Sequence, residues 1–103
     1  PDEAFITRAM AGAEYDDFCG TWLWYEGKEA DVPTGFMITT KKADGNYCMA
    51  CYNADLSDRK SVHQVVRDGD TIVVNARKPQ PLVQKAPFKY AVEWDNGNRW
   101  YKS

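Results

Sequence analysis

The sequence is poor in the residues that carry most metal binding and much of enzymatic chemistry. It has one histidine and three cysteines. An odd count excludes a fully paired disulfide framework, and leaves either one disulfide with a free thiol or three buried thiols, the interpretation that the burial tendency of cysteine favours. The Cys48-x-x-Cys51 motif lies in a predicted strand, so its sulfurs should point to opposite faces. Cys19 and His63 would complete a zinc set, but no second paired motif follows. We therefore predict no metal and no cofactor.

Other absences exclude further classes. The net charge is −2 and no basic run occurs, which argues against nucleic acid as a partner. No apolar run reaches the roughly 20 residues of a membrane span, and no segment specifies a compartment. The sequence lacks a phosphate-binding glycine loop, a nucleophile elbow and a glycosidase signature. We assign no catalytic residue, and enzymatic activity stays open but is not favoured.

Aromatic residues, in contrast, are abundant, at 14% of the chain. The clearest pattern is at residues 88–101, where Phe88, Tyr90, Val92 and Trp94 alternate with mostly polar residues. This period of two is typical of a half-buried strand. Asp-Asn-Gly at 95–97 then reverses the chain and predicts a β-hairpin.

The register of this hairpin follows from its side chains. A two-residue Asn-Gly turn would place Trp94 opposite Arg99, with Glu93 opposite Trp100. A three-residue loop, with Gly97 in the left-handed conformation, places Glu93 opposite Arg99 and puts both tryptophans on the apolar face. Because a one-residue shift would move every side chain to the other face, we predict the three-residue loop.

Elsewhere the pattern predicts one helix and five more strands. An apolar stripe with acidic residues at its start predicts a short helix at residues 2–12, followed by an acidic connector to residue 17. The strands are expected at 18–25, 36–41, 47–52, 62–66 and 71–77. Residues 53–60 are expected to form a polar loop, and the proline-rich segment 78–87 an irregular crossing.

Two Asp-Gly turns set the faces of these strands. A two-residue turn at Asp44-Gly45 would align Phe36 and Ile38 with Tyr47 and Met49 on one face. At Asp68-Gly69 two registers remain open for His63. One groups it with Val65, Ile72 and Val74, and the other groups it with Val65, Val73 and Asn75.

We predict an all-β single domain over residues 1–103, in which 18–103 form a small antiparallel up-and-down meander barrel of about seven strands. Closure removes the exposed edges that such a meander would otherwise leave. The alternative is an α+β roll, with the N-terminal helix on an open curled sheet. A barrel of this size either is filled by side chains or holds one small ligand.

Two short motifs resemble lipocalin-like (calycin) barrels. Gly20-Thr21-Trp22 resembles the Gly-x-Trp that begins many of them, and the pattern from Trp94 through Asn96 and Gly97 to Trp100 is similar to a closing hairpin of some small members. A short helix before the first strand is also common in them. The resemblance implies a barrel with a ligand at its open end.

The leading functional hypothesis is therefore non-enzymatic binding of a small apolar or aromatic molecule. Tyrosine and tryptophan suit a planar ligand because they offer broad apolar contact with one polar group. The candidate ligand-binding residues are Trp22, Trp24, Phe36, Tyr47, His63, Tyr90, Trp94 and Trp100. Two alternatives remain: a protein–protein interaction module, such as a subunit of a larger assembly or an enzyme inhibitor, and a small barrel enzyme of cyclase or isomerase type that uses His63 or a tyrosine.

Overall fold

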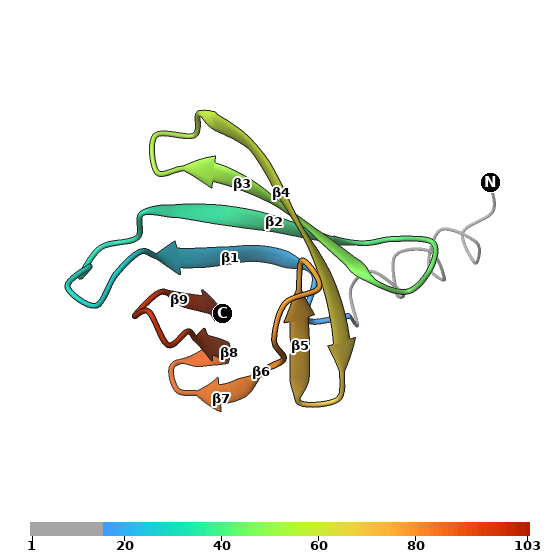
Figure 1. Cartoon of the computed structure of the whole chain (residues 1–103). Helices are drawn as coiled ribbons and strands as arrows, with labels where there is room; N and C mark the ends of the chain where they lie inside the picture. The colour runs from blue at the N-terminus through green and yellow to red at the C-terminus, as the bar shows by residue number, and fades with distance from the viewer. Residues whose placement is uncertain (1–15) are drawn as a thin grey trace.

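The computed structural model describes residues 16–103, which form nine antiparallel β-strands in one sheet that curls into a nearly closed barrel (Figure 1). The predicted N-terminal helix lies outside the described residues, as does the helix of the alternative roll. The strands are β1 (Gly20–Tyr25), β2 (Gly35–Lys41), β3 (Tyr47–Asn53), β4 (Asp58–Asp68), β5 (Thr71–Val74), β6 (Gln80–Pro81), β7 (Val83–Lys85), β8 (Phe88–Glu93) and β9 (Arg99–Lys102).

The strand order explains how the barrel closes. It is β6-β5-β4-β3-β2-β1-β9-β8-β7, so β1 pairs with β9, with Trp24 opposite Trp100. The two edge strands, β6 and β7, are consecutive in the chain and are separated by Leu82. The Leu82 side chain is buried, and its N–H donates to the Asp70 carbonyl at 2.7 Å. The prediction of an all-β antiparallel barrel is confirmed, and its one seam lies between two very short strands, which limits exposed edge.

The strand count is nine rather than the predicted seven. The two additional strands, β6 and β7, lie in the proline-rich segment that we expected to be irregular. They are two and three residues long, which is too short for an alternating pattern to be recognised. Strand β4 also begins earlier than predicted, at Asp58. The prediction missed its first residues because they are exposed and mostly polar, and so show no apolar alternation.

The closing hairpin has the predicted register. Val92 lies opposite Trp100 and Glu93 opposite Arg99. Trp94 N–H donates to the Asn98 carbonyl at 2.8 Å, and Gly97 has φ +92°, as the three-residue loop requires. Glu93 forms its ion pair with Lys85 at 2.9 Å rather than with Arg99.

The hairpin at Asp44-Gly45 differs from the prediction. Lys42 N–H donates to the Asn46 carbonyl at 2.7 Å, so the loop has three residues and Gly45 has φ +88°. The shift moves Met37 and Thr39, rather than Phe36 and Ile38, to the inner face. At the next turn Asp68 lies opposite Thr71 and Val65 opposite Val74. His63 therefore shares the inner face with Val65, Ile72 and Val74, the first of the two registers left open.

The barrel interior is filled at one end. Phe18 is fully buried, and its ring lies 5.0 Å from Trp22 and 4.5 Å from Tyr47, measured between ring centroids. Met37, Met49 and Val65 belong to the same buried cluster. Because this end is filled, space for a ligand must be sought at the opposite end of the barrel.

Within residues 16–103 there is no helix long and apolar enough to cross a membrane.

Candidate functional site

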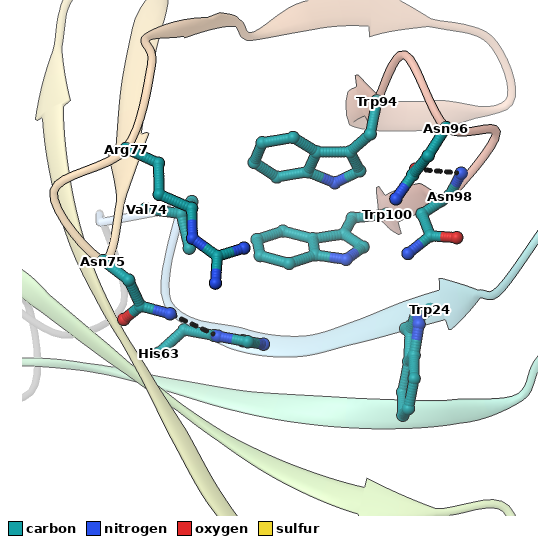
Figure 2. A pocket seen from close by; sticks show the side chains of 9 residues that line it. All are labelled: Trp24, His63, Val74, Asn75, Arg77, Trp94, Asn96, Asn98 and Trp100. Atoms are coloured by element: carbon teal, nitrogen blue, oxygen red, sulfur yellow. Dashed lines mark hydrogen bonds between the residues drawn. The ribbon is translucent and has the colours of Figure 1, made fainter.

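The end of the barrel opposite Phe18 contains a hollow of about 210 Å³, which we name the tryptophan pocket (Figure 2). Its residues come from β1, from β4 and β5 with the turn that follows, and from the closing hairpin. The lining residues are Trp24, His63, Val74, Asn75, Arg77, Trp94, Asn96, Asn98 and Trp100. The pairing of the first strand with the last therefore builds this site.

Three indoles form the apolar walls. Trp94 and Trp100 pack edge to face, with ring centroids 5.0 Å apart and an interplanar angle of 68°. Trp94 Nε1 is buried without a hydrogen-bond acceptor in the described part of the chain. Figure 2 shows this nitrogen on the ring edge that faces Trp100, whose π face is a weak acceptor. On β1, the Trp24 ring lies across Gly35 and under the Arg59 guanidinium at 4.6 Å, which holds it in place.

His63 packs against the closing hairpin, with its ring centroid 5.3 Å from that of Trp100. The proton positions on this imidazole follow from Asn75. The Asn75 Oδ1 accepts from the Gln64 backbone N–H at 2.8 Å, so its Nδ2 must face His63. Nδ2 lies 3.0 Å from His63 Nδ1 and donates to it. A nitrogen that accepts carries no proton, so neutral His63 carries its proton on Nε2.

The electrostatics of the site favour this neutral form. Burial and then the nearby positive charge of Arg77 lower the pKa of His63 below 6.5. Protonation would also place an N–H of His63 against the Asn75 amide N–H. His63 is therefore a hydrogen-bond donor through Nε2 at neutral pH.

Two asparagines of the closing hairpin complete the rim. Asn98 Oδ1 accepts from the Gly27 N–H at 2.9 Å, and Asn96 Oδ1 accepts from the Asn98 N–H at 3.0 Å. These backbone bonds engage the amide oxygens and not the amide nitrogens. Figure 2 shows both nitrogens on the side of the tryptophan rings. The Asn98 bond also joins the hairpin to the loop after β1, so the rim is anchored at two points.

Arg77 brings a positive charge to the pocket. Its backbone N–H donates to the Val74 carbonyl at 3.1 Å, which closes the turn after β5. Figure 2 shows the guanidinium directed toward Trp100. Among the ion pairs of residues 16–103 none involves Arg77.

Three of the predicted ligand-binding residues lie at the filled end instead. Tyr47 donates to Asp16 and Tyr90 donates to Asp17, each at 2.7 Å between oxygens. Trp22 is fully buried, and its Nε1 donates to the carbonyl of Phe18 at 2.8 Å.

The charges at this end follow from the same contacts. Burial acts to raise the pKa of Asp16, but the hydrogen bonds from Tyr47 and Lys41 outweigh it and hold that pKa below its usual value. Burial, and then the hydrogen bond to Asp16, raise the pKa of Tyr47 above 10. These aromatic residues therefore close the barrel and do not line the pocket.

Phe36 lies apart from both groups. It is half-buried and stacks on Tyr52, with ring centroids 5.3 Å apart and an angle of 14°. Its neighbour Met37 is buried, and side chains alternate along β2, so Phe36 is on the outer face. Phe36 lies there because the three-residue loop at Asp44-Gly45 shifts the register of the hairpin by one residue from the predicted one.

The cysteines are not arranged for a shared ion. Cys51 is buried and lies 3.8 Å from the Met49 carbonyl, whereas Cys19 and Cys48 are only half-buried. All three are free thiols. In the described part of the chain no group of three or more His, Cys, Asp or Glu side chains is placed to hold a metal ion.

The structure thus brings together Trp24, His63, Trp94 and Trp100 from the predicted set. It adds residues that were not predicted to bind a ligand, namely Val74, Asn75, Arg77, Asn96 and Asn98. Asn96 and Asn98 had a signal in the predicted turn, because hairpin turns place their polar side chains at the end of the sheet. Comparisons of the chain with protein-family models, with curated proteins and with solved structures gave no match.

Proposed function

We propose that this protein is a non-enzymatic binding protein that holds a small aromatic or apolar molecule in the tryptophan pocket. The observation that carries the proposal is the division of the interior. One end is filled around Phe18, while at the other Trp24, Trp94 and Trp100 surround a hollow of about 210 Å³. Binding sites are typically concave and apolar, with a few polar groups that fix orientation.

The size of the pocket limits the ligand. An apolar cavity of roughly 150 Å³ accepts benzene, whereas pockets for drug-sized molecules begin near 300 Å³. A hollow of about 210 Å³ lies between these values. We therefore expect a ligand of one or two rings, with its flat faces against the indoles. The nearly closed barrel is compatible with the lipocalin-like resemblance, which supports a proposal that the hollow at one end holds the ligand.

The geometry at His63 favours binding over catalysis. A general base needs a free lone pair directed at the substrate. In His63 the lone pair on Nδ1 is engaged by Asn75 at 3.0 Å, and the pocket receives the proton on Nε2. His63 is thus suited to hold an acceptor group.

Native mass spectrometry on protein purified from its own source, with tryptophan fluorescence alongside, tests the proposal. We expect a co-purifying small mass that is lost on denaturation and whose release changes the indole emission. The variant Trp94→Leu should lower affinity for that molecule about threefold to tenfold, the effect of losing one aromatic contact. Phe36→Leu, on the outer face, is the matched control and should change the affinity little.

A bare monomer mass, with no fluorescence response to any small aromatic compound, would contradict the proposal. A stable complex with another protein would move the interpretation to the interaction module.

A further inference from the structure

The polar groups around the tryptophan pocket are nearly all of one kind. Each asparagine that lines it has its amide oxygen engaged by a backbone N–H: Asn75 by Gln64, Asn96 by Asn98, and Asn98 by Gly27, at 2.8, 3.0 and 2.9 Å. An asparagine amide offers one acceptor and two donors. One lone pair of each oxygen is thus occupied, so the three side chains offer mainly N–H groups, of which Asn75 uses one on His63.

The other polar side chains repeat this pattern. His63 has its acceptor nitrogen bonded to Asn75 and its N–H on Nε2. Arg77 offers only donors and carries a full positive charge. Trp24 adds an indole N–H, which Figure 2 shows on the ring edge nearest Asn98. Among residues 16–103, no aspartate or glutamate lines the pocket.

A rim in which N–H donors predominate and the one full charge is positive selects its ligand by charge. A neutral hydrocarbon would leave these N–H groups unpaired when it displaced water, at a cost for each. A ligand that places a hydrogen-bond donor or a positive charge at this rim would be repelled by Arg77. An oxygen anion, in contrast, accepts several of these bonds at once, and such charge-assisted bonds are the stronger kind.

We infer that the tryptophan pocket takes an aromatic carboxylate or a comparable aromatic oxyanion, with its ring between the indoles and its charged group at Arg77 and His63. The inference rests on the proposed function and deepens it. The contacts supply the reason for each part: Trp24, Trp94 and Trp100 offer flat apolar surface, and the turn after β5 places the cation at one side of it.

Three probes with the same ring system test the charge preference. They are 2-naphthoate, its neutral amide, and the corresponding aminomethyl cation, each titrated by calorimetry at neutral pH. We expect the carboxylate to bind at least tenfold more tightly than the amide, and the cation to bind most weakly. Equal affinity for all three would overturn the inference while leaving an aromatic pocket in place. Binding of none of them would contradict the proposed function itself.

A matched pair of variants locates the charged group. Arg77→Leu should lower the affinity for 2-naphthoate about tenfold or more and leave that for the amide within about threefold. Lys78→Leu removes the same charge from the next residue, which is exposed and lies outside the pocket, so it should leave both affinities unchanged. Circular dichroism confirms that both variants are folded. Equal losses for the two variants would show a general charge effect and would overturn the assignment to Arg77.

Discussion

At the scale of single residues, Asn75 determines what His63 offers to a ligand. Its backbone has φ +51°, a left-handed conformation that asparagine adopts more readily than most residues. This turn directs the amide at both Gln64 and His63. One side chain thus closes the turn after β5 and fixes the tautomer of the imidazole.

The substitution Asn75→Asp tests this role. An aspartate keeps the acceptor for Gln64 N–H but replaces the donor to His63 by a second acceptor, which stabilises the imidazolium. We expect the pKa of His63 to move from below 6.5 to above it. Nitrogen-15 NMR of the imidazole measures this directly. Asn96→Asp, in the same pocket without contact to His63, is the control, and an unchanged titration of His63 in Asn75→Asp would contradict the assigned hydrogen bond.

The same change reverses a pH dependence of stability. In the native protein the folded pKa of His63 is lowered, so its contribution to stability is present above 6.5 and is lost as pH falls through the folded value. With the raised pKa of Asn75→Asp, the added stability is present below 6.5 and is lost as pH rises through the new value. Between pH 5 and pH 8, the contribution of His63 to the free energy of unfolding should therefore rise in the native protein and fall in Asn75→Asp. Chemical denaturation at the two pH values measures both changes.

Asn75 also shows a limit of sequence interpretation at this scale. The β-branched run before it led us to extend the predicted strand to residue 77, whereas β5 ends at Val74. Asn75 and Ala76 both have positive φ, and alanine gives no sign of this. Arg77 was missed for the same reason, because its place in the pocket depends on that turn.

At the scale of elements, two hairpins offer a direct comparison. Gly45 and Gly97 occupy the same position of a three-residue loop, with φ of +88° and +92°. A Cβ at Gly45 would meet no atom within 4 Å, whereas one at Gly97 would meet Lys28, including its backbone N at 2.9 Å. The two glycines therefore share the conformational requirement but differ in their surroundings.

We expect Gly45→Ala to lower the free energy of unfolding by about 1–2 kcal/mol, the cost of a left-handed non-glycine residue. Gly97→Ala should cost about 1–3 kcal/mol more, because the backbone of Lys28 must move. It should also weaken ligand binding, since Trp94 and Asn98 flank this loop. Urea denaturation and fluorescence titration measure the two effects, and equal losses of stability would show that the Lys28 contact is easily relieved.

The same hairpins show when sequence predicts register. At residues 95–97 only one register puts both Trp94 and Trp100 inside, so the pattern decided correctly. At Asp44-Gly45 the pattern did not predict the correct register, because apolar residues lie on both faces of β2. Phe36 and Ile38 are half-buried outside, while Met37 lies in the core. Hydrophobicity cannot choose between two faces that are both apolar.

At the scale of the whole molecule, the seam between β6 and β7 should be its weakest part. These strands have two and three residues, whereas β3 has seven and lies between β2 and β4. We expect the amides of Val83–Lys85 to exchange with solvent at least about 100-fold faster than the paired amides of Tyr47–Asn53. Native-state hydrogen exchange measures this, and similar protection would mean that the barrel opens elsewhere.

Closure of the barrel could be predicted from sequence, but the division of its interior could not. Alternation places Trp22 and Trp24 on the same inner face, and local pattern cannot tell which end each one occupies. That depends on Phe18 and on the hydrogen bonds from Tyr47 and Tyr90 to Asp16 and Asp17, which close one end. These are contacts between distant segments, and no local signal precedes them.

The pairing of β1 with β9 has a consequence for biosynthesis. The walls of the pocket come from both ends of the barrel sequence, with Trp24 in the first strand and Trp94 and Trp100 around the last. A ribosome makes Trp24 and His63 well before it makes the hairpin that faces them. Contacts so distant in sequence also form slowly, because a long loop must close first. The site is therefore completed only when the final strand has been synthesised and has found the first.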